Sequence, residues 1–166
     1  MNTIYLALGS NLGNPQLNLI AAIESISQSI GKVEKCSSVY KTAAWGNEDQ
    51  DDFYNQVVLV KTLLKPIELM NCCQQIEKKL GRISKQKWAP RIIDIDILFY
   101  NQLIFNHKDL VIPHPLIQDR NFVLVPLSEI SEGYIHPANN KTIFMLKNEC
   151  QDKLSIVKLK PIQENK

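Results

Sequence analysis

The chain has 166 residues, of which 45% are hydrophobic and 22% are charged, and its net charge is +2 at pH 7. This composition predicts a single globular domain over residues 1–166, and the small net charge argues against a protein that works on nucleic acid or on a membrane surface. No segment approaches the ~18 apolar residues of a membrane span and no basic leader precedes the first apolar run, so a cytoplasmic chain is expected. The cysteines lack metal-ligand spacing, which predicts free, mostly buried thiols at Cys36, Cys72, Cys73 and Cys150.

Strand and helix signals alternate in the first half of the chain. An apolar run at residues 3–8 predicts a buried strand, and Asn14 and Pro15 suit the cap and first position of a helix that ends at Gly31. The turn between them lacks the glycine spacing of a P-loop or a dinucleotide fold and is interpreted as a tight turn with a helix cap. Further elements are expected at residues 33–40 and 53–60 (strands) and 66–80 (helix). The inward stripes of the two helices are predicted at Leu19, Ile23, Ile26 and Ile30, and at Leu69, Cys73, Ile76 and Leu80.

Phe53 and Asn55 stand on one face at the start of the strand at residues 53–60. A flat aromatic ring beside an amide suits stacking on a planar heterocycle and reading of its edge. A core Phe and a turn Asn at a strand end would explain the two residues equally well.

The segment from residue 78 to residue 93 is basic and contains no acidic residue. It leads into a strand in which Asp94 and Asp96 alternate with large apolar residues, so both carboxylates should project from one face. Paired carboxylates suit Mg2+, and arginines suit phosphate oxygens. A solvated strand face and a solvated basic loop are the alternatives for each signal alone. The cations of the segment are Lys78, Lys79, Arg82, Lys85, Lys87 and Arg91, and the apolar positions of the strand, predicted to face the core together, are Ile93, Ile95, Ile97 and Phe99.

The last third of the chain gives weaker signals. Residues 103–105 are expected to pair back on the acid-bearing strand as a hairpin, and residues 120–127 fit a helix or a strand. A short helix is expected at residues 142–147 and a strand at residues 154–160. His114 lies between two prolines in a rigid context, whereas His107 and His136 are expected at the surface.

The order strand, helix, strand, strand, helix, strand up to Tyr100 predicts an α+β fold. A ferredoxin-like core with C-terminal additions and both helices on one face of a layered sheet is the arrangement that fits this order.

The chain resembles the 6-hydroxymethyl-7,8-dihydropterin pyrophosphokinases of folate biosynthesis along nearly its whole length. The motifs that carry the resemblance are residues 8–13 (LGSNLG), the segment 40–55, Gly81-Arg82, residues 88–97 (WAPRIIDIDI) and residues 113–127. The resemblance implies transfer of the β,γ-pyrophosphoryl group of MgATP to the pterin hydroxyl, with release of AMP. It also implies a monomer that binds these two small molecules and neither nucleic acid nor membrane.

The resemblance assigns roles residue by residue. Asp94 and Asp96 would hold two Mg2+ ions, and Arg82 and Arg91 would stabilise the transferring group with help from Lys85. The implied ATP site comprises Gln74, Glu77, Lys85, Trp88, Arg91, Ile97, His114 and Arg120. The implied pterin site comprises Thr42, Ala43, Trp45, Phe53, Asn55 and Phe122, with Trp45 and Trp88 on loops that close over it.

The chain departs from the family pattern at a few positions. Ser84 stands where many members carry a second loop arginine, and the loop from Arg82 to Trp88 is one residue shorter than in some relatives. Two other classes could use parts of the pattern: a nucleic-acid-binding domain on a ferredoxin-like sheet, and a metal-dependent nuclease that uses the acid pair. The first would need aromatic residues in mid-strand, whereas here they lie at strand ends.

Overall fold

The computed structural model describes residues 1–44, 51–82 and 90–161. In chain order its elements are β1 (Asn2–Ser10), α1 (Pro15–Ser29), β2 (Gly31–Cys36), β3 (Tyr40–Thr42), β4 (Phe53–Thr62), α2 (Pro66–Lys79), β5 (Asp94–Tyr100), β6 (Phe105–His107), β7 (Leu110–Ile112), the 3-10 helix η1 (Ile117–Asp119), α3 (Asn121–Ser131), α4 (Ile143–Glu149) and β8 (Ile156–Lys158). Over these ranges, no helix combines the length and the hydropathy that crossing a bilayer requires.

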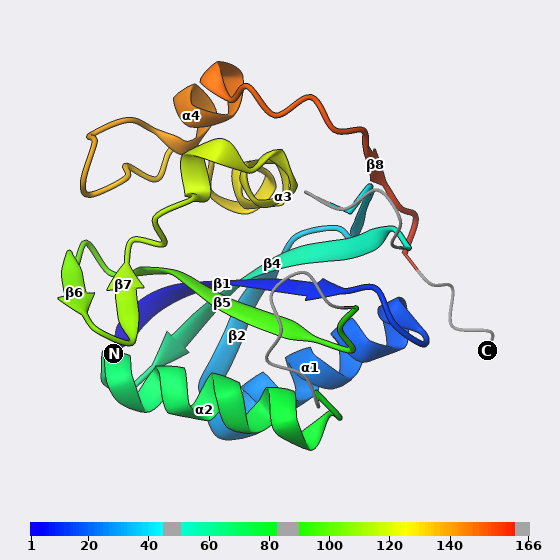
Figure 1. The fold of residues 1–166 in the computed structure, drawn as a ribbon. Coiled ribbons are helices and arrows are strands. Elements are labelled where there is room, and N and C mark those ends of the chain that lie inside the picture. The colour runs from blue at the N-terminus through cyan, green and yellow to red at the C-terminus, as the bar shows by residue number, and fades with distance from the viewer. Residues whose placement is uncertain (45–50, 83–89, 162–166) are drawn as a thin grey trace.

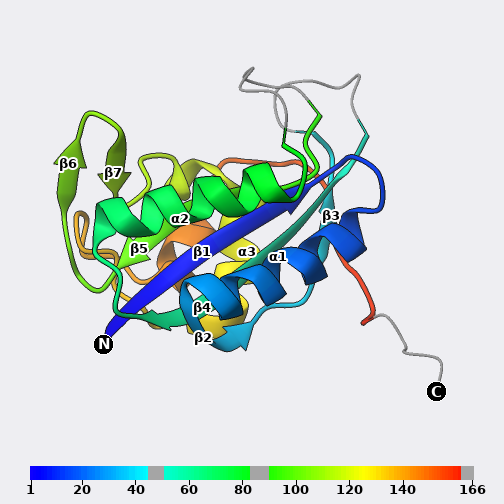
Figure 2. The ribbon, with the colours of Figure 1, turned by 90° about the horizontal axis from the view of Figure 1, so that it is seen from below.

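The main sheet is antiparallel and lies between two layers of helices (Figure 1). Its strand order is β5-β1-β4-β3-β8, and β2 also pairs with β4. Helices α1 and α2 lie side by side under one face (Figure 2), while α3 covers the other face and α4 packs on α3. The predicted α+β, ferredoxin-like arrangement with both early helices on one face is confirmed.

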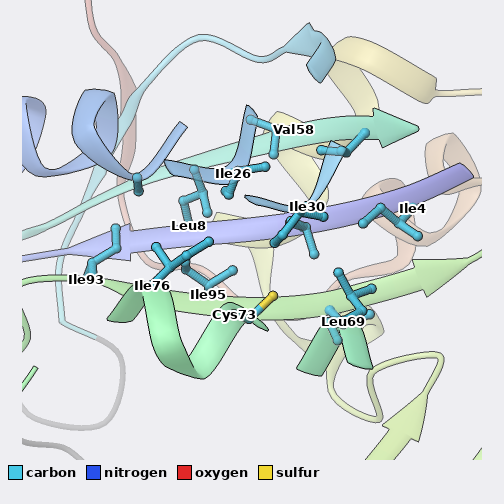
Figure 3. Packing of buried hydrophobic residues seen from close by; sticks show 14 of the residues in the cluster. Ile4, Leu8, Ile26, Ile30, Val58, Leu69, Cys73, Ile76, Ile93 and Ile95 are labelled. Carbon is cyan, nitrogen blue, oxygen red and sulfur yellow. The ribbon is translucent and has the colours of Figure 1, made fainter. Parts of the chain in front are cut away.

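The core between the sheet and α1 and α2 contains the helix stripes predicted from spacing. It buries most of their members completely and packs them against Ile4 and Leu8 of β1 (Figure 3). Asn14 caps α1 as predicted, because its Oδ1 accepts a hydrogen bond of 3.2 Å from the N–H of Leu17. The buried stripe members are Leu19, Ile26 and Ile30 of the first stripe and Leu69, Cys73 and Ile76 of the second, with Ile23 and Leu80 partly buried.

The prediction of one strand over residues 33–40 was wrong. The structure has two strands, β2 and β3, with residues 37–39 between them, and the pairing of β2 with β4 also shifts register between Val33 and Lys35. The Ser37 hydroxyl accepts a hydrogen bond from the N–H of Val57, and its carbonyl accepts one from the amide of Gln56. This polar junction replaces part of the ladder and lets β3 pair with the first residues of β4.

Phe99 does not share the face of Ile93, Ile95 and Ile97 as predicted. The pairing of β5 with β1 shifts register between Tyr5 and Leu6, so a bulge at Leu98 turns Phe99 to the opposite face. There it joins the second core cluster, which lies between the sheet and α3 and includes Leu124 and Ile143. Its ring packs edge-on against Tyr5 with centroids 6.0 Å apart.

The predicted pairing of residues 103–105 with the acid-bearing strand was also wrong. Instead β6 pairs with β7 in a separate two-stranded sheet. The outer edge of β5 is covered by a later segment, since the carbonyl of Leu98 accepts a hydrogen bond of 3.0 Å from the N–H of His114.

The C-terminal elements resolve the remaining assignments. Residues 120–127, left open between helix and strand, belong to α3, and the predicted short helix is α4, capped by Thr142. The predicted last strand is β8, which pairs with β3. The cysteines are free, as predicted, although only Cys73 and Cys150 are buried.

The surface placement predicted for His107 is confirmed, but that for His136 was wrong. His136 is buried because its ring packs edge-on against Phe99, at 5.3 Å between centroids.

Candidate active site

Asp94 and Asp96 lie on the same face of the sheet as Phe53 and Asn55. Between the two pairs, β1 presents only Ala7 and Gly9, and we call these two residues the floor. In the strand register, Asp94 of β5 stands opposite Gly9 of β1, and Gly9 stands opposite Asn55 of β4. Asp96 likewise stands opposite Ala7. Because neighbouring strands lie about 4.8 Å apart, roughly 10 Å separates the backbones of β5 and β4. The strand between them presents only a hydrogen atom and a methyl group, so a bound molecule can extend across it.

Sequence reasoning missed this floor. Gly9 was interpreted as part of a tight turn, whereas it is the penultimate residue of β1. A Cβ at Gly9 would lie 3.3 Å from Oδ1 of Asn55 and 3.8 Å from the ring of Phe53, so a side chain there would intrude on both. The available signal was the alternation of small residues, Ala7 and Gly9, on the strand face opposite Leu6 and Leu8.

Two arginines and two carboxylates meet at the start of β5. Arg82 donates to one oxygen of Asp94 at 2.7 Å, and Arg91 donates to the other at 2.5 Å. Arg82 also pairs with Glu77 of α2 at 2.6 Å, and Glu77 accepts a hydrogen bond from the N–H of Ile95 at 2.7 Å. Four predicted site residues, Glu77, Arg82, Arg91 and Asp94, are thus brought together in a single ion-pair network.

Two carboxyl groups near the start of β5, Asp96 and Glu77, have pKa values above their ordinary range. Burial raises the pKa of Asp96, and the neighbouring Asp94 raises it further, although Arg120 and Arg91 act in the opposite direction. Burial also raises the pKa of Glu77. Asp94 and Asp96 lie on one strand face, and a hard divalent cation bound there would offset their charge.

Asn11 makes two hydrogen bonds to the backbone of Arg91. Its N–H donates to the carbonyl of Arg91 at 3.0 Å, and its side-chain oxygen accepts from the N–H of Arg91 at 2.8 Å. Asn11 is only 3% exposed, so these bonds are shielded from water. Asn11 was not predicted as a site residue, because its partner is eighty positions away in the chain.

We expect Asn11→Ala to lower both stability and turnover. Leaving the N–H of Arg91 without its side-chain acceptor should lower the free energy of unfolding by about 1–3 kcal/mol and release Arg91 from its position. Urea denaturation and steady-state kinetics measure the two effects. The matched control is Asn14→Ala, which removes a helix cap worth about 1 kcal/mol and leaves Arg91 untouched. If the two variants have the same kcat, Asn11 has no role in placing Arg91.

Other residues predicted for ATP are arranged around the outer edge of β5. His114 follows β7, and its Nδ1 accepts a hydrogen bond of 3.2 Å from the N–H of Leu116, so in the neutral ring Nε2 carries the proton. The guanidinium of Arg120 lies 5.6 Å from the ring centroid of Phe122. Gln74 is exposed on α2, one turn before Glu77.

Ile97 does not present its side chain to this edge. The side chain is 5% exposed and packs in the core with α1 and α2. The N–H of Ile95 points away from the sheet and donates to Glu77. In an antiparallel edge strand the backbone groups of every second residue point to the same side, so those of Ile97 point outward as well. A contact of Ile97 with a nucleotide would therefore involve its backbone.

Burial and the nearby charge of Arg120 lower the pKa of His114 from 6.5 to about 4, with Asp94 acting in the opposite direction. A depressed pKa in the folded state contributes stability above pH 6.5 that is lost as the pH falls towards 4. We therefore expect the stability of the wild type relative to His114→Gln to decrease over this range, measured by urea denaturation at several pH values. The raised pKa values of Asp96 and Glu77 increase stability as the pH falls, which is the opposite of the effect of His114. Both carboxyl groups occur in the wild type and in the variant, so their contribution cancels in the difference in stability between the two proteins. A difference that is constant with pH would contradict the buried, neutral histidine.

The residues predicted for the heterocycle lie on the other side of the floor. Asn55 donates to the hydroxyl of Thr42 at 2.8 Å, and both side chains are buried. Thr42 stands opposite Phe53 in the pairing of β3 with β4, and Ala43, the next residue, is exposed. Phe122 stands at the start of α3, which packs over β3 and β4. An aromatic ring at the start of β4, another at the start of α3 and a fixed amide on β4 are groups that suit a flat ring with polar edges, and we refer to the proposed space between Phe53 and Phe122 as the slot.

Three predicted site residues, Trp45, Lys85 and Trp88, lie outside the described residues, as does Ser84.

Comparison with known proteins identifies the family to which this site belongs. The sequence model of the family described as 7,8-dihydro-6-hydroxymethylpterin-pyrophosphokinase (HPPK) matches residues 5–132. The 2-amino-4-hydroxy-6-hydroxymethyldihydropteridine pyrophosphokinase of Aquifex aeolicus is 42% identical over 149 residues, which cover 90% of this chain and 92% of that protein. The enzyme of the same name from Haemophilus influenzae is 40% identical over 162 residues, covering 97% of this chain and 100% of that protein.

A solved structure matches the fold. The crystal structure of wild-type Plasmodium falciparum HPPK-DHPS with SDX-DHP superposes with a TM-score of 0.71 at 21% identity. The match covers 90% of this chain but only 43% of that longer chain, and at this identity it supports the fold alone. The match of the family model over residues 5–132 and the relatives of about the same length show that the chain belongs to the 7,8-dihydro-6-hydroxymethylpterin-pyrophosphokinase family.

Proposed function

We propose that this chain transfers the β,γ-pyrophosphoryl group of ATP to the hydroxymethyl group of 6-hydroxymethyl-7,8-dihydropterin, a step of folate biosynthesis. The observation that carries the proposal is the arrangement across the sheet. Asp94 and Asp96, with Arg82 and Arg91, stand on one side of the Ala7 and Gly9 floor, and Asn55 with Thr42 stands on the other. One side suits polyphosphate and metal, the other a heterocycle with a polar edge.

The reaction forms one phosphorus–oxygen bond, breaks another and releases one proton to water. The pterin hydroxyl oxygen bonds to the β-phosphorus and loses its proton, and the bond from the β-phosphorus to the α,β-bridging oxygen breaks to release AMP. Phosphoryl transfer requires little covalent chemistry from the protein, so alignment of two substrates and stabilisation of charge are the main contributions of the residues. The slot fixes the ring so that its hydroxymethyl group points across the floor to the acid pair.

The charged residues act on the phosphates. Asp94 and Asp96 would hold Mg2+, two ions by the family resemblance, and the metal would supply positive charge that offsets the charge of the phosphates. Arg82 and Arg91, which pair with Asp94 in the structure, would turn their remaining N–H groups to the transferring group. Arg120 and His114 would contact the nucleotide at the edge of β5.

We also propose the domain extent, the location and the oligomeric state. The chain would act as one pyrophosphokinase domain over residues 1–166, in the cytoplasm, as a monomer whose partners are its two small-molecule substrates.

Product analysis tests the proposal. Protein incubated with MgATP and 6-hydroxymethyl-7,8-dihydropterin should release AMP, separated from ADP by anion-exchange chromatography, and only when pterin is present. Formation of ADP would indicate transfer of a single phosphoryl group. AMP formed equally without pterin would indicate hydrolysis of ATP and would contradict the proposed acceptor.

A further inference from the structure

Glu129 of α3 connects this helix to the strands beside the proposed heterocycle slot. One carboxylate oxygen accepts hydrogen bonds from the hydroxyl of Ser38 at 2.8 Å and the ammonium of Lys158 at 3.3 Å. The other accepts from the N–H of Ser38 at 3.1 Å and the hydroxyl of Tyr40 at 2.7 Å. One side chain therefore joins α3 to the start of β3 and to β8.

The groups that Glu129 contacts are next to the slot. Tyr40 stands opposite both Asn55 of β4 and Lys158 of β8, and Thr42, two residues along β3, accepts the hydrogen bond of Asn55. On α3, Glu129 follows Phe122 by seven residues, or about two turns, so the two side chains lie on the same face of the helix. Any shift of Glu129 relative to β3 therefore moves Phe122 relative to Phe53 and Asn55.

The network around Glu129 is charged at neutral pH. Burial acts to raise the pKa of Glu129, but the hydrogen bonds from Tyr40, Ser38 and Lys158 bring it below its ordinary value. Burial, together with the bond to Glu129 and its charge, raises the pKa of Tyr40 to about 12. Hydrogen bonds to an ionised carboxylate are stronger and shorter than neutral ones.

The surroundings of Glu129 are open to water. Its side chain is 28% exposed and lines a groove of about 600 Å³ between α3, α4 and β3. A substitution there leaves both hydrophobic cores intact, so its effect on the slot can be separated from unfolding.

We propose that Glu129 is a positioning residue that fixes the distance between α3 and β3–β4, and thereby the width of the slot between Phe122 and Phe53. This inference rests on the proposed function, since it assigns the slot to the pterin ring. Glu129 has no contact with the reacting groups in this account and acts through Tyr40, Ser38 and Phe122.

The test is the affinity for 6-hydroxymethylpterin, measured by its fluorescence in the presence of a non-hydrolysable MgATP analogue. Glu129→Ala should raise the Kd for pterin by about tenfold and Glu129→Gln, which keeps one of the two acceptor oxygens, by less. The Kd of the nucleotide analogue alone and the kcat at saturating pterin should change by less than about twofold. Tyr40→Phe should raise the pterin Kd as well, and the combination with Glu129→Ala should be less than additive because the two residues share a bond.

Glu132→Gln is the matched control, since Glu132 is exposed near the end of the same helix, and it should leave every constant unchanged. An unchanged pterin Kd in Glu129→Ala, or equal weakening of pterin and nucleotide, would overturn the inference while leaving the proposed function in place. Failure of the wild type to bind pterin would instead overturn the proposed function and the inference together.

Discussion

Replacement of Asp96 by Asn is expected to lower kcat by about 10³-fold with an unchanged far-UV circular dichroism spectrum. Metal ions stabilise transition-state charge by several kcal/mol, and each 1.36 kcal/mol corresponds to a factor of ten in rate. Asn keeps the shape of Asp96 but removes the charge that the metal requires. Because burial raises the pKa of Asp96, the neutral amide should also leave stability unchanged or higher.

The measurement is steady-state turnover as a function of Mg2+ concentration, with urea denaturation as the check on folding. Asp109→Asn provides the control, because Asp109 is an exposed carboxylate between β6 and β7. It should behave as the wild type does. Near-normal turnover of Asp96→Asn at saturating Mg2+ would exclude Asp96 as a metal ligand.

Arg91→Ala is expected to lower kcat by roughly 10²–10³-fold and to change the KM for ATP much less. Its guanidinium is placed by the bond to Asp94 and by the backbone bonds to Asn11, so it stands ready before a ligand binds. Preorganised positive groups aimed at developing phosphate charge act mainly in the transition state. Arg91→Lys should recover only part of the loss, because an ammonium group cannot make the two parallel bonds of a guanidinium.

Steady-state kinetics of the two variants, with Lys78→Ala on the exposed surface of α2 as control, measures this effect. An increase in KM for ATP with unchanged kcat would assign Arg91 to ground-state binding rather than to the transferring group.

The fold could be predicted where local patterns determine it. The helix stripes, the cap at Asn14 and the alternation that sets Asp94 and Asp96 apart from Ile93 and Ile95 all depend on residues a few positions apart. These local signals were sufficient for the order of the ferredoxin-like core and for the position of the acid pair in it.

The wrong predictions arose where distant parts of the chain determine the structure. The bulge at Leu98 depends on pairing with β1 and on the aromatic cluster around Phe99, and neither leaves a local signature. Likewise the break at Ser37 depends on side-chain bonds to β4.

The same contrast between local patterns and long-range contacts applies to the site. The proximity of Arg82, Arg91 and Asp94 could be predicted because they are concentrated in one segment, whereas the contacts of Asn11 and Glu129 were missed. Asn11 acts on Arg91 and Glu129 acts on Ser38 and Tyr40, across long stretches of chain. A polar residue whose role is to hold another residue in place can be recognised only when the tertiary contacts are known.

Following the β-phosphorus of ATP tests directly whether the chain transfers a pyrophosphoryl group to the pterin. ATP labelled with ³²P at the β-position would be incubated with Mg2+, 6-hydroxymethyl-7,8-dihydropterin and either the wild type or Asp96→Asn, and the products separated by chromatography. We predict that the wild type moves the label from nucleotide to pterin as AMP appears, and that the variant does so about 10³-fold more slowly. Label that remains on a nucleotide as ADP, or that is released as free pyrophosphate, would contradict the account.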